Sequence, residues 1–188
     1  RRQRQMCIRD SRRSSIHILF LHNPREELLD LTPAIQFFNT EKNNGSILYG
    51  GLSAAKGYQY DLLQCKQLDI LQDDVNLLFL DGMLNYKRKN NSFYARSPLA
   101  TGILSGKMTN KTVFSSNDYR ASWLKGKRLK SILKRVNAIQ KLTDINLPSL
   151  ARRFVLQLPN VDKVIFGLKS LQHVDDLLRD INASSVSY

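Results

Sequence analysis

The sequence predicts an α/β fold built on a parallel sheet. Short apolar runs rich in β-branched and aromatic residues alternate along the chain with longer segments of helical period, which is typical of strands joined by helices. With 188 residues, 42% of them hydrophobic, the chain is long enough to bury a core. We count about five strands, which is more than half of an eight-stranded (β/α)8 barrel but short of the whole.

The first strand and the first helix have clear boundaries in the sequence. Residues 16–21 (IHILFL) form a nearly continuous apolar run that is stopped by Pro24, as expected for a buried parallel strand. Thr32 and Pro33 then supply an N-cap and a first-turn proline for a helix, and Gly45 stands where the C-cap should be.

The remaining elements continue the same alternation of strand and helix. The second strand is expected to end where it meets Gly50 and Gly51. In chain order, the elements are a strand over 46–49, a helix over about 58–67, a strand over 68–72, a strand over 92–95, a long amphipathic helix over 120–142, a helix over 148–158, a strand over 164–166 and a helix over 171–181.

Functional side chains are expected where the strands end. Parallel strands joined by helices bring their C-terminal ends to one edge of the sheet, so the residues directly after each apolar run become candidates. These residues are His22, Ser53, Gln72, the segment 96–99 and the segment 167–170.

The formal charge of +13 raises nucleic acid as a partner, but its distribution argues against one. Six arginines and one aspartate lie in residues 1–13, so a tail without helical or strand period carries +5 of the total. The densest remaining stretch, residues 125–135, has apolar residues at helical spacing and is typical of a solvated helix face. A basic nucleic-acid-binding module is therefore only a lesser alternative.

The two ends of the chain differ in character from the rest. Residues 1–13 resemble a translated sequencing adapter, and residues 184–188 resemble the start of another. We therefore expect residues 14–183 to be the folded material, although a natural basic tail is the other interpretation of residues 1–13.

Cysteine use and hydropathy exclude several classes of protein. Cys7 and Cys65 have no CxxC spacing and no nearby cluster of histidines, so the sequence predicts neither a metal site nor a disulfide framework. The longest apolar runs are too short to span a bilayer, and the start lacks the apolar core of a signal peptide. We expect a cytoplasmic protein without a membrane partner, and the sequence gives no indication of oligomeric state.

Five segments, taken in order, carry a family resemblance. They are HILFLHNP, GSILYGGLSA, LQDDVNLL, ARSPLATGILSGK and SLARRFVLQLPNVDKVIFGLKSLQHVDDLL. In order and spacing they resemble segments of the aldo-keto reductase family, whose fold is a (β/α)8 TIM barrel. The resemblance spans residues 16–181 and implies that the chain corresponds to about strands 4 to 8 of that barrel, with their helices.

The resemblance implies an NADP(H)-dependent oxidoreductase that reduces aldehydes and ketones to alcohols. The family's catalytic tetrad is Asp, Tyr, Lys and His, and only the histidine has a match here. That match is His22, which would orient the substrate carbonyl and stabilise charge on its oxygen. The other three residues belong to the family's first three strands, so we expect this chain to be a fragment that is inactive by itself.

The resemblance also implies a binding site for NADP(H), with NAD(H) as the alternative cofactor. Ser53 and Gln72 would bind the nicotinamide carboxamide, although the family's usual Asn beside the serine is Ala54 here. Arg96 would stack on the nicotinamide ring. The pyrophosphate would follow Ser97, Leu99 and Gly102 with Lys107 nearby, and the adenosine 2′-phosphate would lie at Gly167, Leu168, Lys169 and Ser170, followed by His173 and Asp176.

Two weaker interpretations of the same residues stay open. His22 by itself would more often be a strand-end histidine held by backbone groups than a catalytic residue. A regulatory barrel that binds NADP(H) without turnover would also keep the cofactor residues. Such a barrel would lack the catalytic tyrosine and lysine even in its full length.

Overall fold

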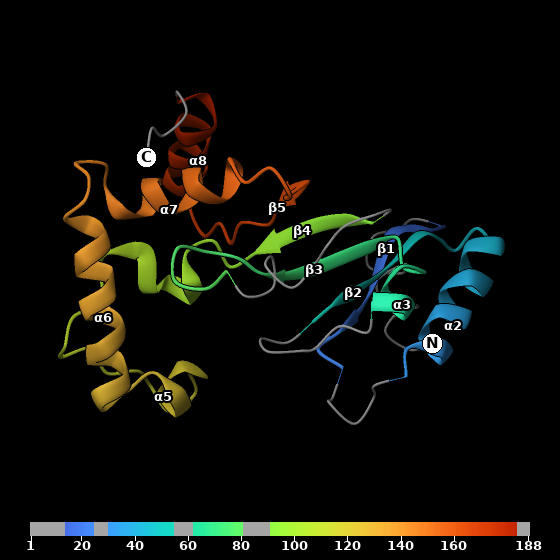
Figure 1. Ribbon diagram of the computed structural model, residues 1–188, viewed down its shortest axis with the longest axis horizontal. Helices are drawn as coiled ribbons and strands as arrows, with labels where there is room; N and C mark the ends of the chain where they lie inside the picture. Colours follow the sequence, from blue (N-terminus) through green and yellow to red (C-terminus); the bar gives the residue numbers. More distant parts are fainter. Residues whose placement is uncertain (1–13, 25–29, 55–61, 81–90, 184–188) are drawn as a thin grey trace. The chain divides into compact units, whose positions relative to one another are not determined.

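The computed structural model describes residues 14–24, 30–54, 62–80 and 91–183 (Figure 1). The predicted tails, residues 1–13 and 184–188, lie outside the described residues. The chain divides into two compact units. The first comprises Arg1–Asp73, Asp81–Ala95 and Asn160–Lys163, and the second comprises Asp74–Leu80, Arg96–Pro159 and Val164–Tyr188.

The described residues form one five-stranded sheet in which the strands are neighbours in chain order. The first strand pairs in parallel with the second, and the second pairs in parallel with the third. The predicted α/β fold with a parallel sheet is confirmed. The strands are β1 (Ile16–His22), β2 (Ile47–Ser53), β3 (Ile70–Asp74), β4 (Ser92–Arg96) and β5 (Lys163–Val164).

Helix α2 (Thr32–Asn43) connects β1 to β2, as the sequence predicts. Thr32 is not its N-cap, however, because Leu31 occupies that position and the carboxylate of Asp30 accepts a hydrogen bond from the Thr32 backbone N–H at 2.9 Å. Pro33 lies in the first turn, and Gly45 follows the helix at a φ of 68°. A left-handed residue just past the last turn is the usual way to end a helix.

Strand β2 continues beyond its predicted end, through Gly50 and Gly51. A Cβ atom on Gly50 would lie 2.4 Å from the ring of Phe38, and one on Gly51 would lie 2.7 Å from the carbonyl oxygen of Ile70. These glycines therefore allow close packing of α2 and the neighbouring strand, and they do not make a turn. The expectation that the strand stops before them is wrong.

Strand β1 forms where the sequence predicts it, but its predicted burial is wrong. Each of its seven residues is partly or fully exposed. Within the described part of the chain β1 is the first strand of the sheet, so only β2 flanks it. The apolar run identifies the strand, whereas its burial depends on what covers it.

The predicted long helix over 120–142 is two helices, α5 (Arg120–Trp123) and α6 (Gly126–Gln140), in the second unit. Leu124, which separates them, is fully buried, and Gly126 has a φ of 54°. The helix breaks because Leu124 turns into the core and the chain restarts at a left-handed glycine. The predicted amphipathic character of 125–135 is confirmed, since Leu129, Ile132 and Leu133 are buried.

Helices α7 (Leu147–Leu156) and α8 (Leu171–Asn182) pack against each other, close to their predicted bounds. Asn146 caps α7 by accepting a hydrogen bond from the Ser149 N–H at 3.1 Å. A 3₁₀ helix, η1 (Ala100–Ser105), was not predicted, and α3 (Leu62–Cys65) is the described end of the helix expected over 58–67. Among the described residues, no helix is both long and apolar enough to cross a bilayer.

Candidate functional site

Three of the predicted site residues lie in one row across the ends of β1, β2 and β3, in the first unit. His22 is the register partner of Ser53, and Ser53 is the register partner of Gln72. Residues in register on parallel strands point to the same face of the sheet, and neighbouring strands are about 4.8 Å apart. The strand ends therefore bring these three side chains together, as the sequence analysis expects.

The hydroxyl of Ser53 donates a hydrogen bond to Oε1 of Gln72 at 2.8 Å. Ser53 is 1% exposed and Gln72 is 8% exposed, whereas His22 is exposed. Because Oε1 accepts the serine proton, the Nε2 group of Gln72 is left as a donor of two N–H bonds. This pair offers amide and hydroxyl groups at the sheet edge, beside an imidazole.

Arg96 is a predicted site residue that lies in the second unit. Its Nε lies 2.9 Å from Oδ1 of Asp74, and the two side chains are only 18% and 25% exposed. The backbone carbonyl of Arg96 accepts from the Val75 N–H at 3.0 Å. A guanidinium held in this way has a fixed plane, which is what stacking on a flat ring requires.

The loop after β4 is held in an uncommon backbone conformation. Ser97, Ala100 and Thr101 all have positive φ, at 57°, 48° and 56°, and Gly102 follows at 94°. Non-glycine residues in this region cost conformational energy and cluster at functional sites. The side chain of Asn76 donates to the Ser97 carbonyl at 3.2 Å, which helps to hold the loop.

Arg120 also contacts this loop, although the sequence does not predict it as a site residue. Its Nη1 donates to the Thr101 carbonyl at 3.0 Å, and its guanidinium lies 4.5 Å from the centre of the Phe114 ring. A Cβ atom on Gly102 would come within 3.2 Å of the same Nη1. Sequence pattern offers no signal for this role, because it depends on the fold bringing α5 back to the loop.

Asp118 fixes the orientation of Arg120. Its carboxylate accepts hydrogen bonds from Nε of Arg120 at 2.9 and 3.1 Å and from Nη2 at 2.5 Å. The hydrogen bonds from Arg120 lower the pKa of Asp118 to about 2, and the charge of Lys169 contributes.

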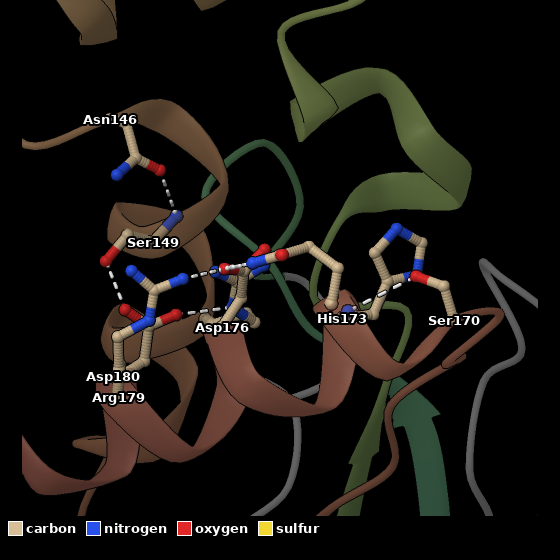
Figure 2. Close-up of polar contacts among 9 residues, drawn as sticks. Asn146, Ser149, Ser170, His173, Asp176, Arg179 and Asp180 are labelled. Carbon is tan, nitrogen blue, oxygen red and sulfur yellow. Dashed lines mark hydrogen bonds and ion pairs between the residues drawn. The ribbon is translucent and has the colours of Figure 1, made fainter.

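The turn before α8 presents its predicted residues to solvent. Gly167, Leu168, Lys169 and Ser170 are all exposed. The Ser170 side chain caps α8 by accepting from the His173 N–H at 3.3 Å (Figure 2). The backbone N–H of Lys169 donates to Nδ1 of His173 at 3.2 Å, so the proton of a neutral His173 is on Nε2.

The other predicted site residues of the second unit differ in their exposure and in the hydrogen bonds that they already make. Lys107 is exposed, and Leu99 is packed against the core of this unit. Asp176 already accepts a hydrogen bond from Gln172 at 2.8 Å and another from Arg179. The hydrogen bond from Gln172 and the charge of Arg179 hold the pKa of Asp176 below its ordinary value.

Comparison with known proteins gives one consistent result. The model of the aldo/keto reductase family matches residues 3–186. None of the curated proteins matches the chain.

Solved structures show the same likeness. A glycerol dehydrogenase from Gluconobacter oxydans matches 99% of this chain at a TM-score of 0.78 and 19% identity, over 59% of its own length. The holo form of an aldo-keto reductase from Bacillus halodurans matches 99% of this chain at a TM-score of 0.70 and 18% identity, over 60% of its own length. The apo form of the Bacillus enzyme matches 99% of this chain at a TM-score of 0.70 and 16% identity, over 63% of its own length. The chain thus spans about three fifths of the length of these structures.

Proposed function

Because the chain belongs to the aldo/keto reductase family, we propose that it carries the cofactor-binding part of an NADP(H)-dependent oxidoreductase that reduces aldehydes and ketones to alcohols. The observation that supports this most directly is the row formed by His22, Ser53 and Gln72 at the C-terminal ends of adjacent parallel strands. Parallel α/β enzymes bind and transform their ligands at this edge.

We propose that residues 14–183 form about strands 4 to 8 of a (β/α)8 barrel. The rings of Phe20 in β1 and Tyr94 in β4 are 6.5 Å apart in an edge-to-face contact. In a flat sheet these strands would be separated by three spacings, about 14 Å. The contact therefore favours a sheet that curves strongly, with both rings on its concave face, as a barrel wall does.

The proposed chemistry uses His22 and a bound nicotinamide cofactor, which supplies the hydride. The exposed imidazole of His22 would hydrogen-bond the carbonyl oxygen of a small substrate and stabilise the charge that develops there. Ser53 and Gln72, the next two residues in the same row, would hold the carboxamide, since Nε2 of Gln72 is a donor that suits an amide oxygen. The fixed guanidinium of Arg96 would stack on the ring.

The proposed binding of the cofactor phosphates rests on two features of the second unit. Gly102 lies in the strained loop with Ser97, where a side chain on the glycine would press on Arg120. The turn at Lys169 and Ser170 opens a 12-residue helix, whose N-terminus favours anions. An exposed lysine beside this N-terminus suits a 2′-phosphate, so we favour NADP(H) over NAD(H).

A second candidate is a regulatory barrel that binds NADP(H) without turnover. It would be favoured if the full-length protein also lacked the family's catalytic tyrosine and lysine. We propose that this chain by itself binds cofactor but does not reduce carbonyls, and that it acts in the cytoplasm. A nucleic-acid partner stays the least supported candidate.

The decisive experiment is carbonyl-dependent oxidation of NADPH by a protein that joins this chain to an upstream segment with the family's Asp, Tyr and Lys. The His22→Ala variant is measured beside it, with His17→Ala on the same strand as the matched control. Activity that falls in the first variant and survives in the second supports a reductase with His22 in the site. Cofactor binding without oxidation of NADPH by any aldehyde or ketone would favour the regulatory barrel.

A further inference from the structure

A pocket of about 360 Å³ lies between α7 and α8, within the second unit. Its lining includes three arginines, Arg152, Arg153 and Arg179, and two aspartates, Asp176 and Asp180. Three positive and two negative formal charges leave the lining with a net charge of +1. The reductase function proposed above makes no use of the arginines.

Asp180 is already neutralised by contacts across the two helices (Figure 2). Its two carboxylate oxygens accept hydrogen bonds from the hydroxyl of Ser149 and from Nε of Arg152. Both partners lie on α7, and Asp180 lies on α8. Asp180 therefore joins the two helices, and its charge is compensated before any ligand enters.

Two of the arginines keep donors for a ligand. A guanidinium has five N–H donors, of which Arg152 directs its Nε to Asp180 and Arg179 directs one Nη2 proton to Asp176. Arg152 lines the pocket and is only 8% exposed. Its guanidinium therefore borders the space that a ligand in the pocket would fill.

The N-terminus of α7 adds to the positive potential. Asn146, Pro148 and Ser149, which are the N-cap and part of the first turn, also line the pocket. A helix of ten residues carries a partial positive charge at this end. The lining therefore combines a helix N-terminus with a net positive cluster of side chains.

We propose that this pocket binds a phosphate group, carried either by inorganic phosphate or by the monoester of a small metabolite. A guanidinium matches two phosphate oxygens at once, and three guanidinium groups meet here. The volume falls within the range of small-molecule sites, so it can hold more than a bare anion. Ser170, where the cofactor phosphate is proposed to bind, is about 15 Å from Asp180 along α8 at the helical rise per residue.

The test measures thermal unfolding of the chain in inorganic phosphate and in sodium chloride at matched ionic strength. A specific site raises Tm in phosphate alone and follows the saturation expected for binding to the native state. Arg179→Gln is expected to weaken phosphate binding by about tenfold or more, because a charge-assisted contact is lost. Lys130→Gln, on the exposed face of α6, removes the same charge elsewhere and should leave binding unchanged.

Glycerol phosphate distinguishes the two sources of the ligand. Tighter binding than inorganic phosphate identifies a monoester site, and equal binding identifies a site for the free anion. The side chain of Arg179 is 71% exposed, so this variant is expected to fold. The proposal is overturned if chloride raises Tm equally, if the Arg179 variant responds as the unaltered chain does, or if saturating NADPH abolishes the phosphate response. Binding of a DNA duplex through Arg179 in preference to phosphate would also overturn it.

Discussion

Ser53 and Gln72 are joined by a side-chain hydrogen bond of 2.8 Å between neighbouring parallel strands, at the level where His22 ends the strand beside them. Ser53→Ala removes the donor and leaves the buried Oε1 of Gln72 without it. We expect the free energy of unfolding to fall by about 1–3 kcal/mol, the cost of leaving a buried polar group unsatisfied. Urea titration measures this loss, and the exposed Ser131→Ala on α6 is the control. Equal stabilities of the two variants would show that the bond adds nothing.

Gly51→Ala tests the close packing of β2 against the backbone of β3 at Ile70. The new methyl group would lie 2.7 Å from the Ile70 carbonyl oxygen, so the sheet has to shift. We expect a loss of about 1–3 kcal/mol in the free energy of unfolding, as for other overpacked sites. Gly167→Ala, where nothing lies within 4 Å of the new methyl group, should change stability little. Equal losses at the two positions would contradict the packing account.

The pair formed by Asp118 and Arg120 has a definite pH dependence. The pKa of Asp118 is lowered to about 2 from its ordinary value of 3.8, mainly by the hydrogen bonds from Arg120. A lowered pKa in the folded state means that the pair is fully formed above about pH 4 and is lost as the pH falls toward 2. An NMR titration of the Asp118 carboxyl should therefore give its midpoint near 2.

Arg120→Gln should return that midpoint toward 3.8 and increase hydrogen exchange in residues 97–102. The second effect follows because the contact from Nη1 to the Thr101 carbonyl is lost. Arg128→Gln, at an exposed position on α6, is the control. An unchanged Asp118 midpoint in the Arg120 variant would refute the assigned cause.

Asp180→Ala tests the contact between α7 and α8. It leaves Arg152, which is 8% exposed, without its carboxylate partner. Breaking a buried ion pair in this way is expected to cost about 3–5 kcal/mol of unfolding free energy. Asp175→Ala, on the exposed side of the same helix, should cost far less when both are measured by urea unfolding. A small loss in the Asp180→Ala variant would mean that water hydrogen-bonds the Arg152 guanidinium as well as Asp180 does.

The sequence predicts the order of strands and helices because local periodicity and turn residues determine it. It also identifies the row of His22, Ser53 and Gln72, since parallel strands bring their ends together. The break at Leu124 escapes prediction because it depends on the core that Leu124 enters. The continuation of β2 through Gly50 cannot be predicted for a similar reason. A glycine that makes room for a neighbouring ring looks the same in sequence as a glycine that turns the chain.

Arg120 and Asp118 show where sequence reasoning about the site ends. Nothing in their local pattern indicates that they hold the loop containing Gly102, which lies in an earlier segment. Such a role becomes visible only once the fold brings distant segments together. The family resemblance likewise indicates a ligand site at Lys169 but gives no information on the contact from its backbone to His173.

The most direct test of the central claim is equilibrium binding of NADPH and NADH to this chain, followed by cofactor fluorescence. We expect saturable binding that is tighter for NADPH. We also expect Lys169→Gln to weaken NADPH binding by about tenfold and to leave NADH binding unchanged, because the lysine would contact only the 2′-phosphate. Absence of saturable binding, or equal affinities that the Lys169 variant does not alter, would contradict it.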